Sequence, residues 1–236
     1  MRRLHHPDLP IDGGEVTLGD DASRHAAVLR LAVGDQIALF DGAGHEARAR
    51  IVAVGDHVRC ALDPRERVTS SGPRVVLCQC VPKGAKLDAI VRGATEVGVS
   101  AIHLALAERC VGRVADKRIE RLETIAREAS RQSGRADVPS VLPAAPLLEV
   151  AARAPESALR IACVPGGGSI PTGAPEAWIV VGPEGGLSPG EMGSLDALGY
   201  VRVDLGPTIL RTETAGVVAP ALVRAALARG TGLWTR

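Results

Sequence analysis

The sequence predicts an α/β protein in which a small, mostly β domain precedes a domain built on a parallel sheet. From residue 74 onward, short apolar runs alternate with stretches of helical periodicity, a pattern typical of parallel α/β sheets. Before residue 68, short runs suited to strands are separated by glycine and aspartate turns, which favours a barrel-like module. We therefore place an N-terminal domain at 1–68, a linker at 69–73 and a second domain at 74–236.

In the N-terminal domain we expect four strands and one short helix. The strands are predicted at 15–18, 36–40, 47–54 and 57–62, with turns at Asp41-Gly42 and Gly55-Asp56. The helix begins near Ala22 and carries His25 and Leu29. Serine, glycine and proline residues between 65 and 73 favour a linker in that segment.

In the second domain we expect alternating strands and helices. Strands are predicted at 75–81, 101–105, 159–164, 178–181 and 201–205, and helices at 86–97, 116–133, after Ser188 and at 214–229. The last helix contains Pro220 and is apolar on most of its circumference, so it must be buried. A subunit interface is a natural place for such a helix.

Composition limits how this chain can bind nucleic acid. The net charge is only +1, so binding needs a local patch, and aromatic residues make up 2%, too few for base-stacking platforms. Residues 109–135 include eight basic and four acidic residues. The middle of this run also fits a solvated helix face with ion pairs, whereas its end at Arg131, Gln132 and Arg135 is the better candidate for RNA contacts.

The cysteine and histidine patterns give no indication of a metal site. The five cysteines have no zinc spacing, and Cys78 and Cys80 fit buried thiols on one face of a strand. The histidines form no H-x-H or H-E-x-x-H pattern, so we expect no metal. The sequence shows neither a signal peptide nor an apolar run of transmembrane length, which makes the cytoplasm the expected compartment and a membrane partner unexpected.

The most informative segment is a glycine loop, residues 182–186, which follows a β-branched run. Ser188, Pro189 and Glu191 then fit a capping box that opens a helix, so the loop lies at the carboxyl end of a strand, where α/β sheets bind ligands. The loop has no lysine and lacks G-x-G-x-x-G spacing, which argues against a Walker loop and a dinucleotide site. The sequence therefore predicts a small ligand other than an ordinary nucleotide.

A second segment, residues 203–215, has a similar pattern: the end of a strand is followed by glycine and proline, then by polar residues and the start of an apolar helix. Together, VGPEGG and LGPTILRTETA resemble the SPOUT class of methyltransferases, and more narrowly the ribosomal RNA small subunit methyltransferase E family. Further stretches similar to that family lie at 25–42, 82–84, 94–99, 131–135 and 138–139. The resemblance covers nearly the whole chain.

The resemblance implies a SPOUT-type parallel sheet with a C-terminal trefoil knot, preceded by a PUA-like RNA-binding β-barrel, in a homodimer. It also implies that S-adenosylmethionine lies bent in the knot, held by backbone groups of three loops. The implied cofactor residues are Val164, Pro165, Val181, Gly182, Pro183, Glu184, Gly185, Gly186, Leu205, Gly206, Ile209, Leu210 and Arg211. The glycines also fit tight turns without any ligand.

The family's reaction is methylation of N3 of a uridine in small-subunit (16S) ribosomal RNA. This requires removal of the imide proton and stabilisation of charge on the flanking carbonyl oxygens, and the fixed donors of Arg211 suit the second task. Glu213 or Glu184 is a candidate to take the proton or to position Arg211. Both also fit carboxylates that favour a helix N-terminus, and proximity alone can supply much of the rate without a dedicated base.

The expected RNA contacts are spread along the chain. They are Arg30, Arg109, Arg131, Gln132 and Arg135. The substrate is either free RNA or an assembled ribosomal subunit, and the low net charge favours the subunit. Two positions depart from the family pattern. Gly93 stands where a lysine is usual, and Pro207 replaces a residue that is commonly basic, so each position lacks an expected basic contact.

Three other hypotheses stay open. The chain is also compatible with a non-catalytic RNA-binding or ribosome-assembly factor on the same fold, although the intact loops speak against it. A SPOUT methyltransferase with another RNA target is the second. The third is a Rossmann-type nucleotide enzyme, which would need the G-x-G-x-x-G spacing that this chain lacks.

Overall fold

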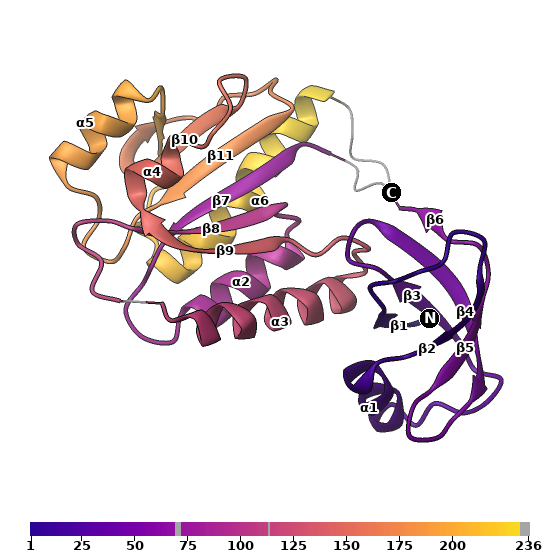
Figure 1. Cartoon of the computed structure of the whole chain (residues 1–236). Coiled ribbons are helices and arrows are strands. Elements are labelled where there is room, and N and C mark those ends of the chain that lie inside the picture. The colour runs from indigo at the N-terminus through magenta and orange to yellow at the C-terminus, as the bar shows by residue number, and fades with distance from the viewer. Residues whose placement is uncertain (69–71, 113, 232–236) are drawn as a thin grey trace. The chain divides into compact units, whose positions relative to one another are not determined.

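The structure is a computed structural model that describes residues 1–68, 72–112 and 114–231. The chain forms two compact units (Figure 1). The first comprises Met1–Ser70 and Arg127–Val138, and the second comprises Ser71–Ala126 and Pro139–Arg236. Residues 127–138 thus group with the N-terminal unit, although the sequence places them in the second domain. Residues 69–71 of the expected linker lie outside the described part of the chain.

The first unit is a mostly antiparallel sheet of six strands with one helix. Its elements are β1 (Arg2–His5), β2 (Gly14–Thr17), α1 (Asp20–Val28), β3 (Gln36–Phe40), β4 (His45–Ala53), β5 (Arg59–Leu62) and β6 (Glu66–Arg67). The strand order is β1-β3-β4-β5-β2, with β6 on β4. Alternating residues such as Ile37, Leu39, Ile51 and Cys60 form its buried core. The sequence did not predict β1 or β6, which are short and rich in charged side chains.

The second unit contains a sheet of six strands, all parallel, which confirms the predicted α/β class. The strands are β7 (Arg74–Cys80), β8 (Ala101–Leu106), β9 (Ser140–Pro146), β10 (Leu159–Gly168), β11 (Glu176–Val181) and β12 (Val201–Val203). Their order is β12-β10-β11-β7-β8-β9. The edge strand β9 was not predicted, because Pro143 and Pro146 interrupt its pattern and are tolerated only at an edge or a strand end.

Helices cover both faces of this sheet (Figure 1). They are α2 (Leu87–Glu96), α3 (Asp116–Ser133), α4 (Leu147–Ala151), α5 (Pro189–Ala197) and α6 (Thr212–Thr231). On one face, Cys78 and Cys80 are fully buried with side chains of α4 and α5, which confirms the predicted buried thiols. The short helix α4 was not predicted. The trefoil knot stays a prediction.

Helix α6 lies on the other face of the sheet, against α2, β7 and β11. Its apolar circumference is therefore covered in large part within the chain itself, and Pro220 is buried in that packing. A subunit interface is not needed to explain its composition, and the homodimer stays a prediction. None of the helices in the described residues is long and apolar enough to cross a membrane.

The close approach of α2 and α6 depends on Gly93. A Cβ at this position would lie 2.6 Å from Cγ2 of Val217, a contact that side chains do not tolerate. Gly93 therefore has a packing role, while the loss of a basic contact at this position stays a prediction. In this chain the position is a helix–helix packing site, where any larger residue would push the two helices apart.

Candidate functional site

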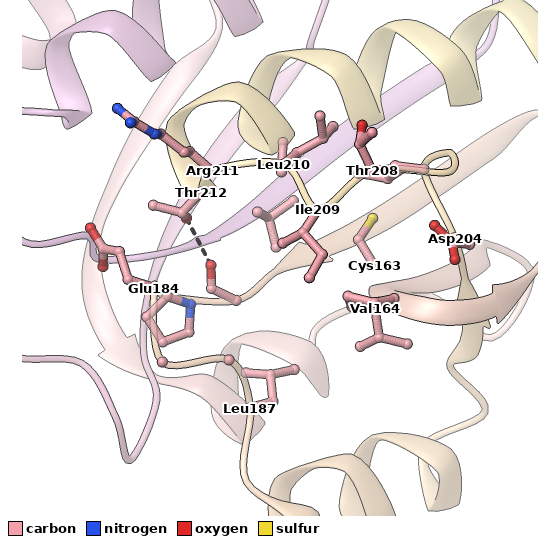
Figure 2. A pocket seen from close by; sticks show the side chains of 18 of the residues that line it. Cys163, Val164, Glu184, Leu187, Asp204, Thr208, Ile209, Leu210, Arg211 and Thr212 are labelled. Carbon is pink, nitrogen blue, oxygen red and sulfur yellow. Dashed lines mark hydrogen bonds between the residues drawn. The ribbon is translucent and has the colours of Figure 1, made fainter.

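A cavity of about 690 Å³ lies where three neighbouring parallel strands end (Figure 2). Its walls come from the end of β10, the glycine loop after β11 and the segment 204–212 after β12. Because β12, β10 and β11 are adjacent and parallel, their carboxyl ends meet at one edge of the sheet. The volume falls within the range of roughly 300–1,000 Å³ that is usual for small-molecule sites.

The structure brings the predicted cofactor residues together in this cavity. The lining includes Val164, Pro165, Val181, Gly182, Pro183, Glu184, Gly185, Gly186, Leu205, Ile209, Leu210 and Arg211. Gly206 is not among the lining residues. Its N–H donates instead to Oδ1 of Asp204, at 3.1 Å.

The first wall is a bulge in β10, at Val164 and Pro165, where the family resemblance implies a cofactor-binding loop. Cys163 and Gly168 both pair with Val203 of β12, so the residues between them leave the regular ladder. This frees Val164 and Pro165 to line the cavity while the strand continues to Gly168.

Asp204 braces this bulge against the third wall. Its carboxylate accepts hydrogen bonds from the N–H of Gly166 at 2.6 Å and from that of Gly206 at 3.1 Å. These N–H groups hold the pKa of Asp204 below its ordinary value. Asp204 was not among the predicted site residues, although an aspartate at a strand end, two residues before a glycine and proline, is a usable signal for such a loop contact.

Two side chains fix the carbonyl groups of the glycine loop. The Thr212 hydroxyl donates to the Gly182 oxygen at 2.8 Å, drawn as a dashed line in Figure 2. Nη1 of Arg109 donates to the Gly185 oxygen at 2.8 Å. Arg109, predicted to contact RNA, thus holds the glycine loop in this structure. The predicted capping box follows, with Ser188 Oγ accepting from Glu191 N and Glu191 Oε2 accepting from Ser188 N.

The remaining surface of the cavity is largely apolar. Figure 2 shows Ile209, Val164 and Leu187 around the same space, and Met192 also lines it. Ile209 is 85% exposed and lines the cavity, so its apolar surface is open to a bound ligand. Apolar side chains can pack against the faces of a planar ring, and neighbouring backbone N–H and C=O groups can form hydrogen bonds with its edge.

A charged cluster lies at one end of the cavity. Nζ of Lys86 lies 2.7 Å from Oε1 of Glu184 and 3.2 Å from Oε2 of Glu213. Burial raises the pKa of Glu184, but the hydrogen bonds from Lys86 and from backbone N–H groups outweigh it and leave the pKa below its ordinary value. The pKa of Glu213 is lowered by its own backbone N–H and by Lys86. Both are therefore ionised carboxylates and weak proton acceptors.

Arg211 is exposed, between the lining residue Leu210 and the buried start of α6. In Figure 2 its side chain and that of Glu184 both extend toward the left edge of the view. Lys86, Asp204 and Thr212, together with Cys163, Leu187, Met192, Thr208 and Ala215, line the cavity but were missed from the sequence.

The other residues predicted to contact RNA lie in the first unit. Arg131 pairs with Glu128 and Arg135 pairs with Asp137, in each case with Nη2 2.6 Å from the carboxylate. Gln132 and Arg30 are exposed, and Arg30 ends α1 in a left-handed conformation with φ of 53°. Among the described residues, no group of three or more His, Cys, Asp or Glu side chains is placed to hold a metal ion.

Comparison with known proteins gives consistent results for both units. Residues 70–224 match the family model described as RNA methyltransferase domain, and residues 18–58 match the one described as RNA methyltransferase PUA domain. The ribosomal RNA small subunit methyltransferase E of Mycobacterium tuberculosis is 35% identical, over 92% of this chain and 88% of the relative. That of Bacillus subtilis is 32% identical, over 85% and 86%.

Solved structures give the same result. The ribosomal RNA small subunit methyltransferase E from Neisseria gonorrhoeae, bound to S-adenosyl methionine, superposes with a TM-score of 0.89 at 31% identity, covering 96% of this chain and 98% of the other. A methyltransferase from Legionella pneumophila in complex with the cofactor SAM gives a TM-score of 0.85 at 27% identity, covering 95% and 97%.

Proposed function

The chain belongs to the ribosomal RNA small subunit methyltransferase E family, and from this premise we propose that it binds S-adenosylmethionine and methylates N3 of a uridine in small-subunit ribosomal RNA. One observation carries the proposal. The glycine loop, the β10 bulge and the segment 204–212 enclose one cavity, and they do so in a chain whose fold matches a structure bound to S-adenosyl methionine.

The residues present fit this cofactor. Adenine needs an apolar surface for its faces and hydrogen bonds for its edge, and the cavity offers both through Ile209, Val164 and the backbone of three loops. The loops are held from behind by Asp204, Thr212 and Arg109, so the backbone groups need little reorganisation on binding. When bound, the cofactor supplies a methyl group bonded to a positively charged sulfur.

Arg211 is the residue that we assign to charge stabilisation. Loss of the N3 proton places negative charge on the flanking carbonyl oxygens of uracil, and the guanidinium offers fixed N–H donors to an oxygen in that position. Arg211 itself lines the cavity, directly after Ile209 and Leu210, which supports this assignment.

The roles that we assign to Glu184 and Glu213 follow from the ion pairs that both make with Lys86. Both carboxylates are bound to Lys86 and have lowered pKa values, so we assign them to holding Lys86 and the glycine loop at the site. The N3 proton then leaves to solvent, and orientation of the uridine against the methyl group supplies much of the rate.

The remaining assignments belong to the same proposal. We assign RNA contacts to the PUA domain through Arg30, and to Arg131, Gln132 and Arg135. Arg109 joins them if its guanidinium keeps donors free for phosphate while it holds Gly185. The protein then acts as a cytoplasmic homodimer on an assembled small subunit.

Titration calorimetry tests the cofactor half of the proposal. We expect S-adenosylmethionine and S-adenosylhomocysteine to bind with one site per chain, and NAD not to bind. Binding of NAD without S-adenosylhomocysteine would favour a Rossmann-type enzyme. If none of these ligands binds, the result would favour a non-catalytic RNA-binding protein on this fold.

A further inference from the structure

Gln79 is an unusual residue for its place in the fold. It lies on the central strand β7, paired with Val181 of β11 and Leu104 of β8, and its side chain is fully buried. Its neighbours on the strand, from Val75 to Cys80, are otherwise apolar and buried. A buried amide lowers stability unless its hydrogen bonds are made, so its presence here needs an explanation.

The amide begins a chain of hydrogen bonds that ends at the glycine loop. Nε2 of Gln79 donates to the Thr212 hydroxyl at 3.1 Å and to the Cys80 carbonyl at 2.9 Å. The Thr212 hydroxyl in turn donates to the Gly182 carbonyl at 2.8 Å (Figure 2). Because Thr212 accepts from the amide, its single proton is directed at Gly182.

Helix α6 has a glycine, Gly216, where it faces the Gln79 side chain. Gly216 lies one helical turn after Thr212, and a Cβ there would stand 2.4 Å from Oε1 of Gln79. Within the described residues, Oε1 is buried without a hydrogen-bond partner. The Gln79 carbonyl oxygen is thus left unpaired while its amide N–H group bonds Thr212. Because an unpaired buried carbonyl lowers stability, packing alone does not explain why a glutamine stands here.

The two members of the hydrogen-bond chain beyond Gln79 are parts of the proposed catalytic site. Gly182 opens the glycine loop, and Thr212 directly follows Arg211. We propose that Gln79 is a positioning residue, which acts through Thr212 to fix the glycine loop and Arg211 relative to each other. This inference rests on the proposed function, because it assigns a role within the same site.

Three variants test the hydrogen-bond chain. Gln79→Met fills similar space without a donor, Thr212→Val removes the hydroxyl at constant shape, and Thr212→Ser keeps the hydroxyl. Thr95→Val is the matched control, because Thr95 is equally buried and its hydroxyl donates to Val91 at 2.7 Å within α2, away from the cavity. For each variant we would measure kcat, the KM for small subunits, the affinity for S-adenosylhomocysteine and the unfolding temperature.

We expect Gln79→Met and Thr212→Val each to lower kcat about ten- to hundredfold, the scale of a small misplacement of reacting groups, with the KM for subunits unchanged. Affinity for S-adenosylhomocysteine is expected to fall about three- to tenfold in both, because the glycine loop loses its anchor. The double variant is expected to be no worse than Thr212→Val alone, since both changes break one chain. Thr212→Ser is expected to lose less than Thr212→Val, and Thr95→Val to match the wild type in kcat and affinity.

Wild-type kcat and affinity in Gln79→Met would overturn the inference. So would fully additive losses in the double variant, or an equal loss of kcat in Thr95→Val, since either result indicates general destabilisation. A wild-type protein that binds S-adenosylhomocysteine but methylates no subunit would refute the proposed acceptor, while the affinity measurements would still decide the role of Gln79.

Discussion

The Lys86 ammonium group lies 2.7 Å from the Glu184 carboxylate and joins the start of α2 to the glycine loop, across 98 positions of sequence. Both side chains are about a third exposed, at 34% and 38%, so the pair contributes little to stability. Its effect is geometric. Lys86 also reaches Glu213, so one ammonium group holds the glycine loop near the start of α6, directly after the third wall.

Lys86→Met is therefore expected to weaken cofactor binding more than stability. Without the ammonium group, two carboxylates are left facing each other at the end of the cavity, and the glycine loop loses a contact. We expect S-adenosylhomocysteine affinity to fall about threefold to tenfold by calorimetry, with an unchanged unfolding temperature.

Lys83→Met is the matched control for this change. Lys83 is a neighbouring lysine whose backbone N–H, rather than its side chain, donates to Glu184. The substitution removes the same charge and keeps that hydrogen bond, so affinity is expected to stay at the wild-type value. An equal loss in both variants would indicate a general charge effect and contradict the specific role of Lys86.

The pH dependence of binding follows from the lowered pKa of Glu184. A carboxyl group whose folded-state pKa lies below its ordinary value of 4.5 stabilises its ion pair above that value, and the contribution is lost as the pH falls through the folded pKa. Affinity for S-adenosylhomocysteine is thus expected to be constant between about pH 6 and pH 8 and to fall only below about pH 4.5.

Glu184→Gln separates this effect from acid unfolding. The amide cannot titrate, so its affinity should be lower at pH 7 and show less change in acid, while Asp204 still titrates in both proteins. A wild-type affinity that already declines between pH 8 and pH 6 would contradict the assignment to Glu184.

Arg211→Ala is expected to abolish most methyl transfer and leave the fold intact. Loss of one preorganised donor at a developing oxyanion typically costs about 10²–10³ in kcat, and the exposed side chain contributes little to packing. Arg211→Lys should recover only part of the rate, because an ammonium group lacks the planar fork. Steady-state kinetics and a thermal melt measure both effects, and a kcat near the wild-type value in Arg211→Ala would remove Arg211 from this role.

Gly93→Ala tests the packing of α2 against α6. The added Cβ would lie 2.6 Å from Val217, so we expect a loss of about 1–3 kcal/mol in the free energy of unfolding, measured in urea. Combining it with Val217→Ala should recover much of that loss, because the second change removes the opposing methyl groups. Additive losses in the double variant would show that the two positions do not meet.

The cofactor loops were predictable because their chemistry is local. Glycine, proline and a capping box lie next to one another in sequence, so VGPEGG and its helix start indicate strand, loop and helix without any tertiary information. Val164, Ile209 and Leu210 were named as cofactor residues because the family resemblance implies them. The buried face of β7, with Cys78 and Cys80, followed from its apolar run.

The parts of the site that were missed come from distant segments. Lys86 reaches the cavity only because β7 lies beside β11, and Thr212 has its role only because Gln79 lies beneath it. The packing constraint at Gly93 could not be predicted for the same reason, since it comes from Val217 on another helix. Arg109 was assigned to RNA on charge alone, and nothing in its neighbourhood in the sequence indicates the Gly185 carbonyl that it binds.

The most direct test of the proposed activity is methyl transfer from labelled S-adenosylmethionine to small ribosomal subunits that lack this modification, followed by nucleoside analysis. The proposed function predicts a single labelled product, 3-methyluridine, with wild-type protein and almost none with Arg211→Ala. Label in a different nucleoside would refute the assignment to N3 of uridine. An absence of label, despite demonstrable binding of S-adenosylmethionine, would contradict the small subunit as the acceptor.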